Sequence, residues 1–256
     1  MHTAPHTPKL KTLTIPGLPD LELVFVEGGE FLMGDDLSPK EDEKPAHRVR
    51  LSDFWMGRWQ VTQRLYETVM GKNPSLFKGS SRLPVEEVSW GDAQAFFEKL
   101  NTLKAVQSFL KTEGLEGRFQ LPTEAQWEYA ARGGRYSADY RYAGSDHLPQ
   151  VGWYKGNSGW QTHEVGLMLP NELGLYDMSG NVWEWCADWY SDSYYAACKE
   201  KEPVQDPQGP DGGEDRVQRG GSCFNLSQRC RACRRYYLHP DLRGDDAGFR
   251  VAFAPG

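Results

Sequence analysis

The sequence predicts one α+β domain in which short strands and a few helices are separated by long, ordered loops. Glycine (27 residues) and tryptophan (9 residues) are plentiful, whereas long amphipathic helices are few. A large domain with little regular structure depends on buried aromatic side chains and on loops whose backbone groups are hydrogen-bonded. At 256 residues, with 39% hydrophobic and 25% charged, the chain has the composition of a globular protein.

Three helices are predicted from capping residues and periodicity. Residues 62–70 begin with Thr62, a residue type that caps helix N-termini. Residues 90–100 follow Ser89, another such type, and carry four apolar side chains on one face. A third, shorter helix is expected at 123–132, between a proline and a pair of glycines.

The predicted strands are short and lie at 21–26, 31–33, 48–51, 54–58 and 249–253. The first dozen residues are polar and lack the apolar core of a signal peptide. We therefore expect residues 1–15 to form a disordered or linker tail and residues 16–256 to form a single domain.

One C-terminal segment, residues 223–247, has neither helix nor strand period. It lies between Arg219-Gly220-Gly221-Ser222 and Gly248-Phe249-Arg250, and it mixes aromatic, cationic and acidic residues freely. Such a mixture is more typical of a surface that contacts a ligand than of a packed core.

Charge and cysteine usage exclude several classes of protein. The net charge of −7 argues against general nucleic-acid binding, although four arginines fall within residues 229–235. No apolar run approaches the roughly 20 residues that a membrane span needs. Cys230 and Cys233 have metal-site or redox spacing, but no second cysteine or histidine pair completes a zinc site.

Several motifs together resemble the formylglycine-generating-enzyme, or sulfatase-modifying factor, family. They occur in the family's order over about residues 20–254, and the resemblance implies an extended C-type-lectin-like fold in one domain. The motifs are Gly28-Gly29-Glu30-Phe31-Leu32-Met33-Gly34, Pro45-Ala46-His47-Arg48-Val49, Pro84-Val85-Glu86-Glu87-Val88-Ser89-Trp90, Leu121-Pro122-Thr123-Glu124-Ala125-Gln126-Trp127-Glu128, Gly174-Leu175-Tyr176-Asp177-Met178-Ser179-Gly180-Asn181-Val182-Trp183-Glu184-Trp185 and the Gly-Gly-Ser and Gly-Phe-Arg motifs.

The resemblance does not extend to the family's catalytic residues. Members that oxidise a substrate cysteine carry two cysteines five residues apart, with a histidine directly after the first. The aligned positions here are Asn225, Leu226 and Cys230. A single thiol does not supply the paired thiolates that Cu(I) prefers. We therefore expect no enzymatic activity, and the alternative is an oxidase of this type with an altered thiol site.

The C-terminal segment resembles the variable region of diversity-generating-retroelement proteins. In these, a reverse transcriptase randomises adenines copied from a template, and asparagine codons are the usual targets. The resemblance implies a fixed frame of Gln228, Cys230, Arg231, Arg235, Pro240, Asp241, Arg243 and Gly248-Phe249-Arg250. It implies thirteen exchangeable binding positions: Phe224, Asn225, Leu226, Arg229, Arg234, Tyr236, Tyr237, Leu238, His239, Leu242, Gly244, Asp245 and Asp246.

Residue types missing from the segment agree with this mechanism. Randomised asparagine codons never encode Lys, Glu, Gln, Met or Trp, and these five types make up more than a fifth of the chain. About six are expected in the 25 residues 223–247, and only Gln228 is present. We expect Arg231 and Arg235 to anchor the frame through acids such as Asp241.

The family also implies a calcium site. It uses the positions of Asp177 and Glu184, through side-chain oxygens, and of Gly180 and Val182, through backbone oxygens. The second interpretation is that the neighbouring tryptophans belong to the core and that Glu184 is bonded to an arginine or to backbone.

Two functions therefore stay open, a ligand-binding display protein with a diversified surface and the altered oxidase. For the first, we expect an unknown protein or cell-surface ligand, a monomer, no nucleic acid, no membrane span and no required cofactor beyond the structural calcium named above. A diversified binder is useful outside the cell, so we expect export and display at the cell surface through a signal or lipid anchor not seen in this chain, with a cytoplasmic location as the alternative.

Overall fold

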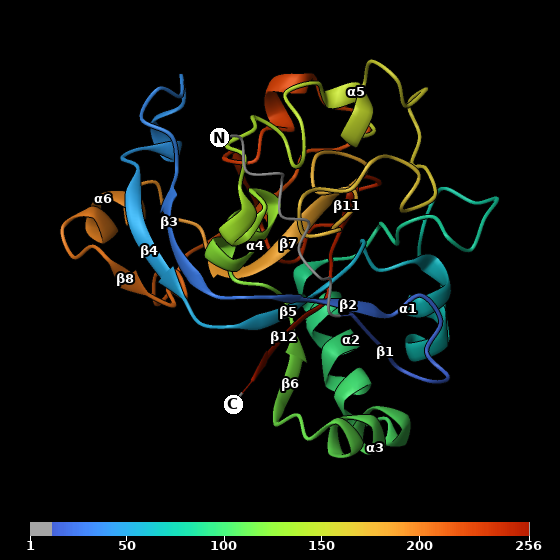
Figure 1. Cartoon of the computed structure of the whole chain (residues 1–256). Coiled ribbons are helices and arrows are strands. Elements are labelled where there is room, and N and C mark those ends of the chain that lie inside the picture. The colour runs from blue at the N-terminus through green and yellow to red at the C-terminus, as the bar shows by residue number, and fades with distance from the viewer. Residues whose placement is uncertain (1–11, 256) are drawn as a thin grey trace, which may run out of the picture.

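Three small sheets form the framework of the chain, whose computed structural model describes residues 12–255 (Figure 1). The largest has five antiparallel strands in the order β1-β2-β5-β12-β6. Their bounds are β1 Thr12–Thr14, β2 Glu22–Val26, β5 Phe54–Gly57, β12 Ala252–Pro255 and β6 Gly117–Gln120. Since β12 pairs with both β5 and β6, this C-terminal strand joins β6 to the rest of the sheet.

The second sheet contains the two strands of the C-terminal segment, β10 and β11. Its order is β10-β9-β7-β11, with β11 parallel to β7 and the other neighbours antiparallel. The strands are β7 Trp183–Trp189, β9 Arg216–Arg219, β10 Arg235–Leu238 and β11 Ala247–Gly248. A third sheet, in the order β3-β4-β8, joins β3 Gly29–Met33, β4 His47–Leu51 and β8 Val204–Gln205.

Six α-helices and three short 3-10 turns complete the described structure. The helices are α1 Gln63–Met70, α2 Trp90–Thr102, α3 Lys104–Glu113, α4 Glu124–Ala131, α5 Leu148–Val151 and α6 Tyr194–Lys199. The 3-10 turns are η1 Glu41–Glu43, η2 Gly134–Tyr136 and η3 Ser227–Arg229. The three predicted helices are present, and Thr62, Ser89 and Thr123 accept N-cap hydrogen bonds from backbone N–H groups at their starts.

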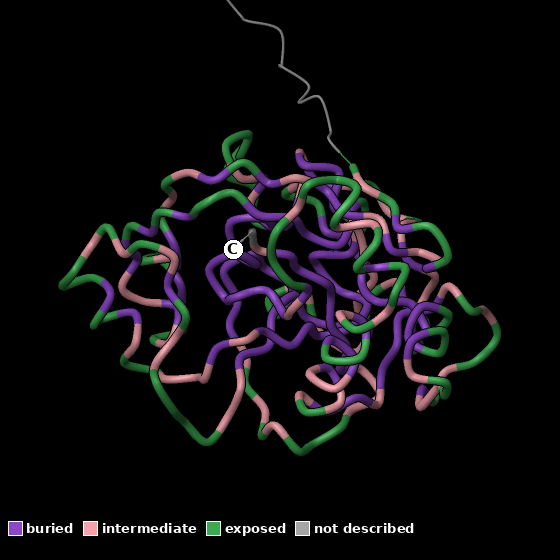
Figure 2. The backbone as a smooth tube through the Cα atoms, turned by 90° about the horizontal axis from the view of Figure 1, so that it is seen from below, coloured by how far each residue is buried: buried purple, intermediate pink, exposed green. Residues whose placement is uncertain are grey.

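The core has two main parts, and buried backbone gathers in the middle of the molecule (Figure 2). One part packs α1 and α2 against the five-stranded sheet, with Phe96 and Phe97 against Phe249. The other surrounds α4, all eight residues of which are buried. Because α4 contacts β3, β4, β7 and β9, it joins the two smaller sheets.

Two predictions differ from the structure. Residues 12–14 form β1 and Ile15 is buried, so residues 12–15 belong to the fold and not to a tail, while residues 1–11 lie outside the described residues. The C-terminal segment was expected to lack regular structure, yet it contains η3 and β10. β10 forms because pairing with β9 satisfies its backbone, a tertiary effect that periodicity cannot reveal.

Candidate binding surface

The C-terminal segment starts from a turn that requires glycine. Gly220 and Gly221 have φ values of 97° and 76°, a region that residues with a Cβ rarely adopt. A Cβ on Gly221 would lie 2.7 Å from the sulfur of Cys230 and 2.8 Å from the carbonyl oxygen of Arg229. The turn therefore lets the chain fold η3 closely back against the start of the segment.

A buried ionic network on α4 holds the inner side of the segment. Arg235 donates to both carboxylate oxygens of Glu124, at 2.7 and 3.0 Å, and Arg219 donates to Glu124 at 3.0 Å and also pairs with Glu128. All four side chains are buried. Burial alone would lower the pKa of Arg235, but the Glu124 carboxylate outweighs it and raises that pKa. Both guanidinium groups are therefore charged, and they fix the backbone from beneath.

A second anchor lies at η1. Arg231 donates to Glu43 at 2.9 Å and pairs with its other oxygen at 2.8 Å, and Arg234 donates to the same carboxylate at 3.1 Å. The expected anchor through Asp241 is wrong, because Asp241 is exposed and its carboxylate lies 3.8 Å from His239. Glu43 and Glu124 hold the frame instead, and both come from far earlier in the sequence.

Nearly all the exchangeable positions reach the surface. Those that are exposed are Leu226, Arg229, Tyr237, His239 and Leu242. Those that are half-buried are Phe224, Asn225, Tyr236, Leu238, Gly244, Asp245 and Asp246. Arg234 is the exception, because its guanidinium turns inward to Glu43. In the fixed frame, Cys230, Arg231, Arg235 and the Gly-Phe-Arg motif are buried, whereas Gln228, Asp241 and Arg243 are exposed.

A row of four aromatic rings, here called the tyrosine stack, supports one part of this surface. Tyr236 packs on Trp183 with ring centroids 4.9 Å apart, and Tyr237 packs on Tyr190 at 4.1 Å. The centroids of the two tyrosines of β10 lie 5.9 Å apart, and the guanidinium of Arg229 lies 5.7 Å from the Tyr236 ring. Trp183 and Tyr190 belong to the earlier chain, so they give the exchangeable rings a fixed backing.

A second aromatic group surrounds Phe224. Its ring centroid lies 6.1 Å from that of Phe77 and 6.1 Å from that of Trp160. Trp160 is 57% exposed, and the ammonium of Lys155 lies 4.6 Å from its ring centroid. The backbone N–H of Lys155 also donates to the carbonyl of Asn225. Fixed residues of the loop 153–163 therefore extend the surface beyond the C-terminal segment.

The position aligned with the family's thiol pair holds one buried sulfur. Asn225 and Leu226 reach the surface, whereas Cys230 is fully buried, and burial raises the pKa of its thiol to about 12. All five cysteines are free and buried. A thiol with so high a pKa is protonated at neutral pH, whereas the thiolate is the nucleophile and metal ligand.

The predicted calcium residues converge on an amide group. Nε2 of Gln60 donates toward the carbonyl oxygens of Asp177, Gly180 and Val182 and toward Oε1 of Glu184, at 3.0 to 3.2 Å. A calcium ion needs oxygens at about 2.3–2.6 Å, so it would collide with this nitrogen. The oxygens suit calcium in chemistry, but the residues as arranged do not fit the ion.

The carboxylate of Glu184 also has hydrogen-bond donors for both of its oxygens without a metal. Both its oxygens accept from Arg250, at 2.6 and 2.7 Å, and Oε2 accepts from Trp127 at 2.7 Å. Its neighbours Trp183 and Trp185 are buried, as the second interpretation expects. Gln60 Oε1 and Asp177 Oδ1 are buried without a hydrogen-bond partner among the described residues, and burial raises the pKa of Asp177 to about 6.

Comparison with known proteins places the chain in a family. The sulfatase-modifying factor enzyme 1-like domain matches residues 16–255, almost all of the described chain. The chain belongs to this family. The predicted family membership and C-type-lectin-like fold are thus confirmed.

Relatives within the sulfatase-modifying factor family carry different descriptions. The chain is 37% identical over 210 residues to a chaperone protein LppX of Paenibacillus barcinonensis, covering 66% of this chain and 72% of that protein. It is 31% identical, over an alignment of 300 residues that includes gaps, to the formylglycine-generating enzyme of Streptomyces coelicolor, covering 90% of this chain and 88% of that protein.

Two solved structures share the fold along almost their whole length. Treponema denticola variable protein 1 superposes with a TM-score of 0.80 at 33% identity, covering 97% of this chain and 100% of that one. PvdO from Pseudomonas aeruginosa superposes with a TM-score of 0.75 at 26% identity, covering 95% and 97%.

Sequence reasoning missed the residues outside the segment that support or adjoin the binding surface, namely Phe77, Lys155, Trp160, Trp183 and Tyr190. They reach the segment from three separate parts of the chain. An isolated aromatic residue in a sequence is equally consistent with the core, so no local signal could have identified them.

Proposed function

We propose that this chain is a ligand-binding protein whose C-terminal segment forms a diversified binding surface. One observation carries the proposal: twelve of the thirteen exchangeable positions are exposed or half-buried, whereas the arginines that hold the backbone face inward onto Glu43 and Glu124. Exchange of outer side chains leaves such a frame intact, and a fixed frame with variable contacts is the arrangement of an antibody paratope.

The residue types of the surface suit protein or cell-surface ligands. Tyr236 and Tyr237 offer large, rigid contact area, and tyrosine and arginine are enriched among residues that dominate binding energy. The likeness to a structure described as a variable protein supports the proposal. Among residues 12–255, no helix is both long and apolar enough to cross a membrane. We propose that the protein acts as a monomer at the cell surface, which protease treatment of intact cells would test.

Sequencing sister genes from related isolates tests the diversification. We expect substitutions confined to the thirteen exchangeable positions, with no Lys, Glu, Gln, Met or Trp among them. Invariance at these positions, or equal variation elsewhere, overturns the proposal.

A stability comparison tests the frame independently of the genes. Arg229→Ser changes an exchangeable, exposed side chain and should leave the melting temperature within about 2 °C of the parent. Arg235→Ser leaves Glu124 buried and only partly paired, and breaking such a pair costs about 3–5 kcal/mol. Similar losses in the two variants would contradict the division into frame and surface.

We also propose that the chain is not an oxidase. Cys230 is buried without a second thiol at the aligned position, and the relatives described as formylglycine-generating enzymes are the reason to test the alternative. Turnover of a cysteine-containing sulfatase peptide with copper and oxygen, abolished by Cys230→Ser, would establish the oxidase instead.

A further inference from the structure

A large cavity adjoins the exchangeable positions. It has a volume of about 1020 Å³ and lies between the loop that follows β3, the loop 132–146 and the η3 region. Leu226, Arg229 and Arg234, three exchangeable positions, line it. Pockets of roughly 300–1,000 Å³ bury a drug-sized ligand, so this cavity has room for a short stretch of a partner chain.

The rim of the cavity carries exposed apolar side chains. Leu32, Leu37, Tyr140 and Leu226 all line the cavity and are all exposed, Leu37 to 94%. Clustered apolar side chains around a polar hollow are typical of a surface that a partner protein covers.

The five arginines of the cavity divide into two sets, and Lys40 also lines it. Arg132, Arg231 and Arg234 are paired with buried carboxylates behind the wall. Arg141 and Arg229 have no carboxylate within ion-pair distance among residues 12–255, and each lies instead over a tyrosine ring.

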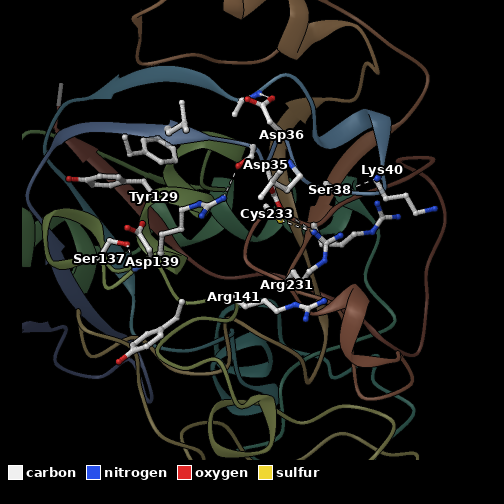
Figure 3. A pocket seen from close by; sticks show the side chains of 18 of the residues that line it. Asp35, Asp36, Ser38, Lys40, Tyr129, Ser137, Asp139, Arg141, Arg231 and Cys233 are labelled. Carbon is white, nitrogen blue, oxygen red and sulfur yellow. Dashed lines mark hydrogen bonds and ion pairs between the residues drawn. The ribbon is translucent and has the colours of Figure 1, made fainter.

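Five acidic residues also line the cavity, and one of them, Asp146, accepts a hydrogen bond from the backbone N–H of Arg141 at 2.8 Å. Asp35 and Asp36 lie on the opposite side of the cavity from Arg141, and Asp139 lies to one side (Figure 3). Asp35 is 3.8 Å from Arg231, and Asp36 accepts from the backbone N–H of Ala46. Two guanidinium groups of the cavity lining, those of Arg141 and Arg229, therefore have no carboxylate partner among the described residues and can bind an anion.

We propose that this cavity receives a loop of the partner protein and that Arg141 and Arg229 bind a carboxylate side chain on that loop. The inference rests on the proposed function, because it makes the cavity part of the same binding surface. Arg141 is a fixed residue and Arg229 an exchangeable one. Exchange at Arg229 therefore changes the charge that this cavity selects, while the lining residues from outside the C-terminal segment stay constant.

Short capped peptides test the proposal without knowledge of the natural ligand. The probes are acetyl-Leu-Glu-Leu-amide and its Gln and Lys counterparts at millimolar concentration, and the readout is the shift of backbone amide resonances in ¹⁵N-labelled protein. We expect the Glu peptide to shift amides of residues 35–40, 137–141 and 226–234 and to bind about tenfold more tightly than the Gln peptide. The Lys peptide should bind more weakly still.

Substitutions test whether Arg141 and Arg229 are the residues that bind the peptide carboxylate. Arg141→Gln should weaken binding of the Glu peptide about tenfold, and Arg229→Asp should reverse the preference to the Lys peptide. Arg118→Gln changes an exposed arginine outside the cavity and should have no effect. Unchanged melting temperatures establish that the variants are folded.

Equal binding of the three peptides, no shift in the cavity amides, or binding that ignores both substitutions overturns the inference. If sister genes vary at the exchangeable positions but the cavity ignores charge, the proposed function stands and this inference alone fails. If the cavity selects the Glu peptide but sister genes are invariant, the diversified function is the one that fails.

Discussion

Removal of the Gln60 amide should destabilise the protein, and calcium should not stabilise the parent. The amide nitrogen has two protons to share among four buried oxygens, three of them backbone carbonyls. Without it at least two of these oxygens lose a donor, and each buried acceptor left unpaired costs about 1–3 kcal/mol. Gln60→Ala should therefore cost about 2–6 kcal/mol, or roughly 5–20 °C in melting temperature.

Gln60→Glu tests the same cluster with opposite chemistry. The new carboxylate faces Glu184 and three carbonyl oxygens, so the variant should be strongly destabilised in a chelator. It also adds a hard ligand to an oxygen set that suits calcium. Added calcium should therefore rescue the variant, by about 2.7 kcal/mol at a concentration 100 times its dissociation constant.

Thermal unfolding in excess EDTA and in millimolar calcium measures each effect. The matched control is Gln107→Glu, an exposed position on α3, which should not respond to calcium. A rise of several degrees in the parent on adding calcium would refute the reasoning, because the amide would then have moved aside for the ion. A Gln60→Glu variant as stable as the parent in EDTA would refute it equally.

Three further predictions follow from buried charges and thiols. Arg231→Ser should destabilise the protein more than Arg234→Ser, since Arg231 contacts both oxygens of Glu43 and Arg234 only one; chemical denaturation measures the difference, and a larger loss at Arg234 would be contrary to it. Asp188→Asn should raise the melting temperature more at pH 8 than at pH 5. Burial, then the charge of Glu124, raises the pKa of Asp188 to about 7 from an unfolded value near 3.9, so folding becomes less favourable as pH rises through this window. The opposite pH trend would count against that burial. All five cysteines are buried, so a thiol reagent at pH 8 should label them only after denaturation, and rapid labelling of the folded protein would contradict the structure.

Local features of the fold could be predicted, because they are written in neighbouring residues. Thr62, Ser89 and Thr123 are caps that act within three residues. The strand β7 could not be predicted from an alternation of apolar and polar residues, because both faces of the strand are covered: five of its seven residues are buried. It exists through pairing with β9 and β11, at the centre of a sheet assembled from distant segments.

The binding surface divides in the same way. Residue types and the resemblance identified the outward positions, but not what holds them. The anchor Glu43 lies 188 residues before Arg231, and Glu124 lies 111 residues before Arg235. A carboxylate in a sequence gives no indication of which arginine it will meet, so Asp241, a near neighbour, was chosen wrongly.

Under the proposed diversification, Arg234 is the buried position among the thirteen, and its contacts indicate why the frame would tolerate its exchange. Its carboxylate partner Glu43 also accepts from Ser38 at 2.5 Å and from Arg231, so it keeps donors when Arg234 changes. Arg234 lines the cavity as well, and a smaller residue there would enlarge the cavity without leaving an unpaired buried charge. Because Ser38 and Arg231 also hold Glu43, a substitution at Arg234 would change the depth of the cavity while the backbone around η3 stays in place.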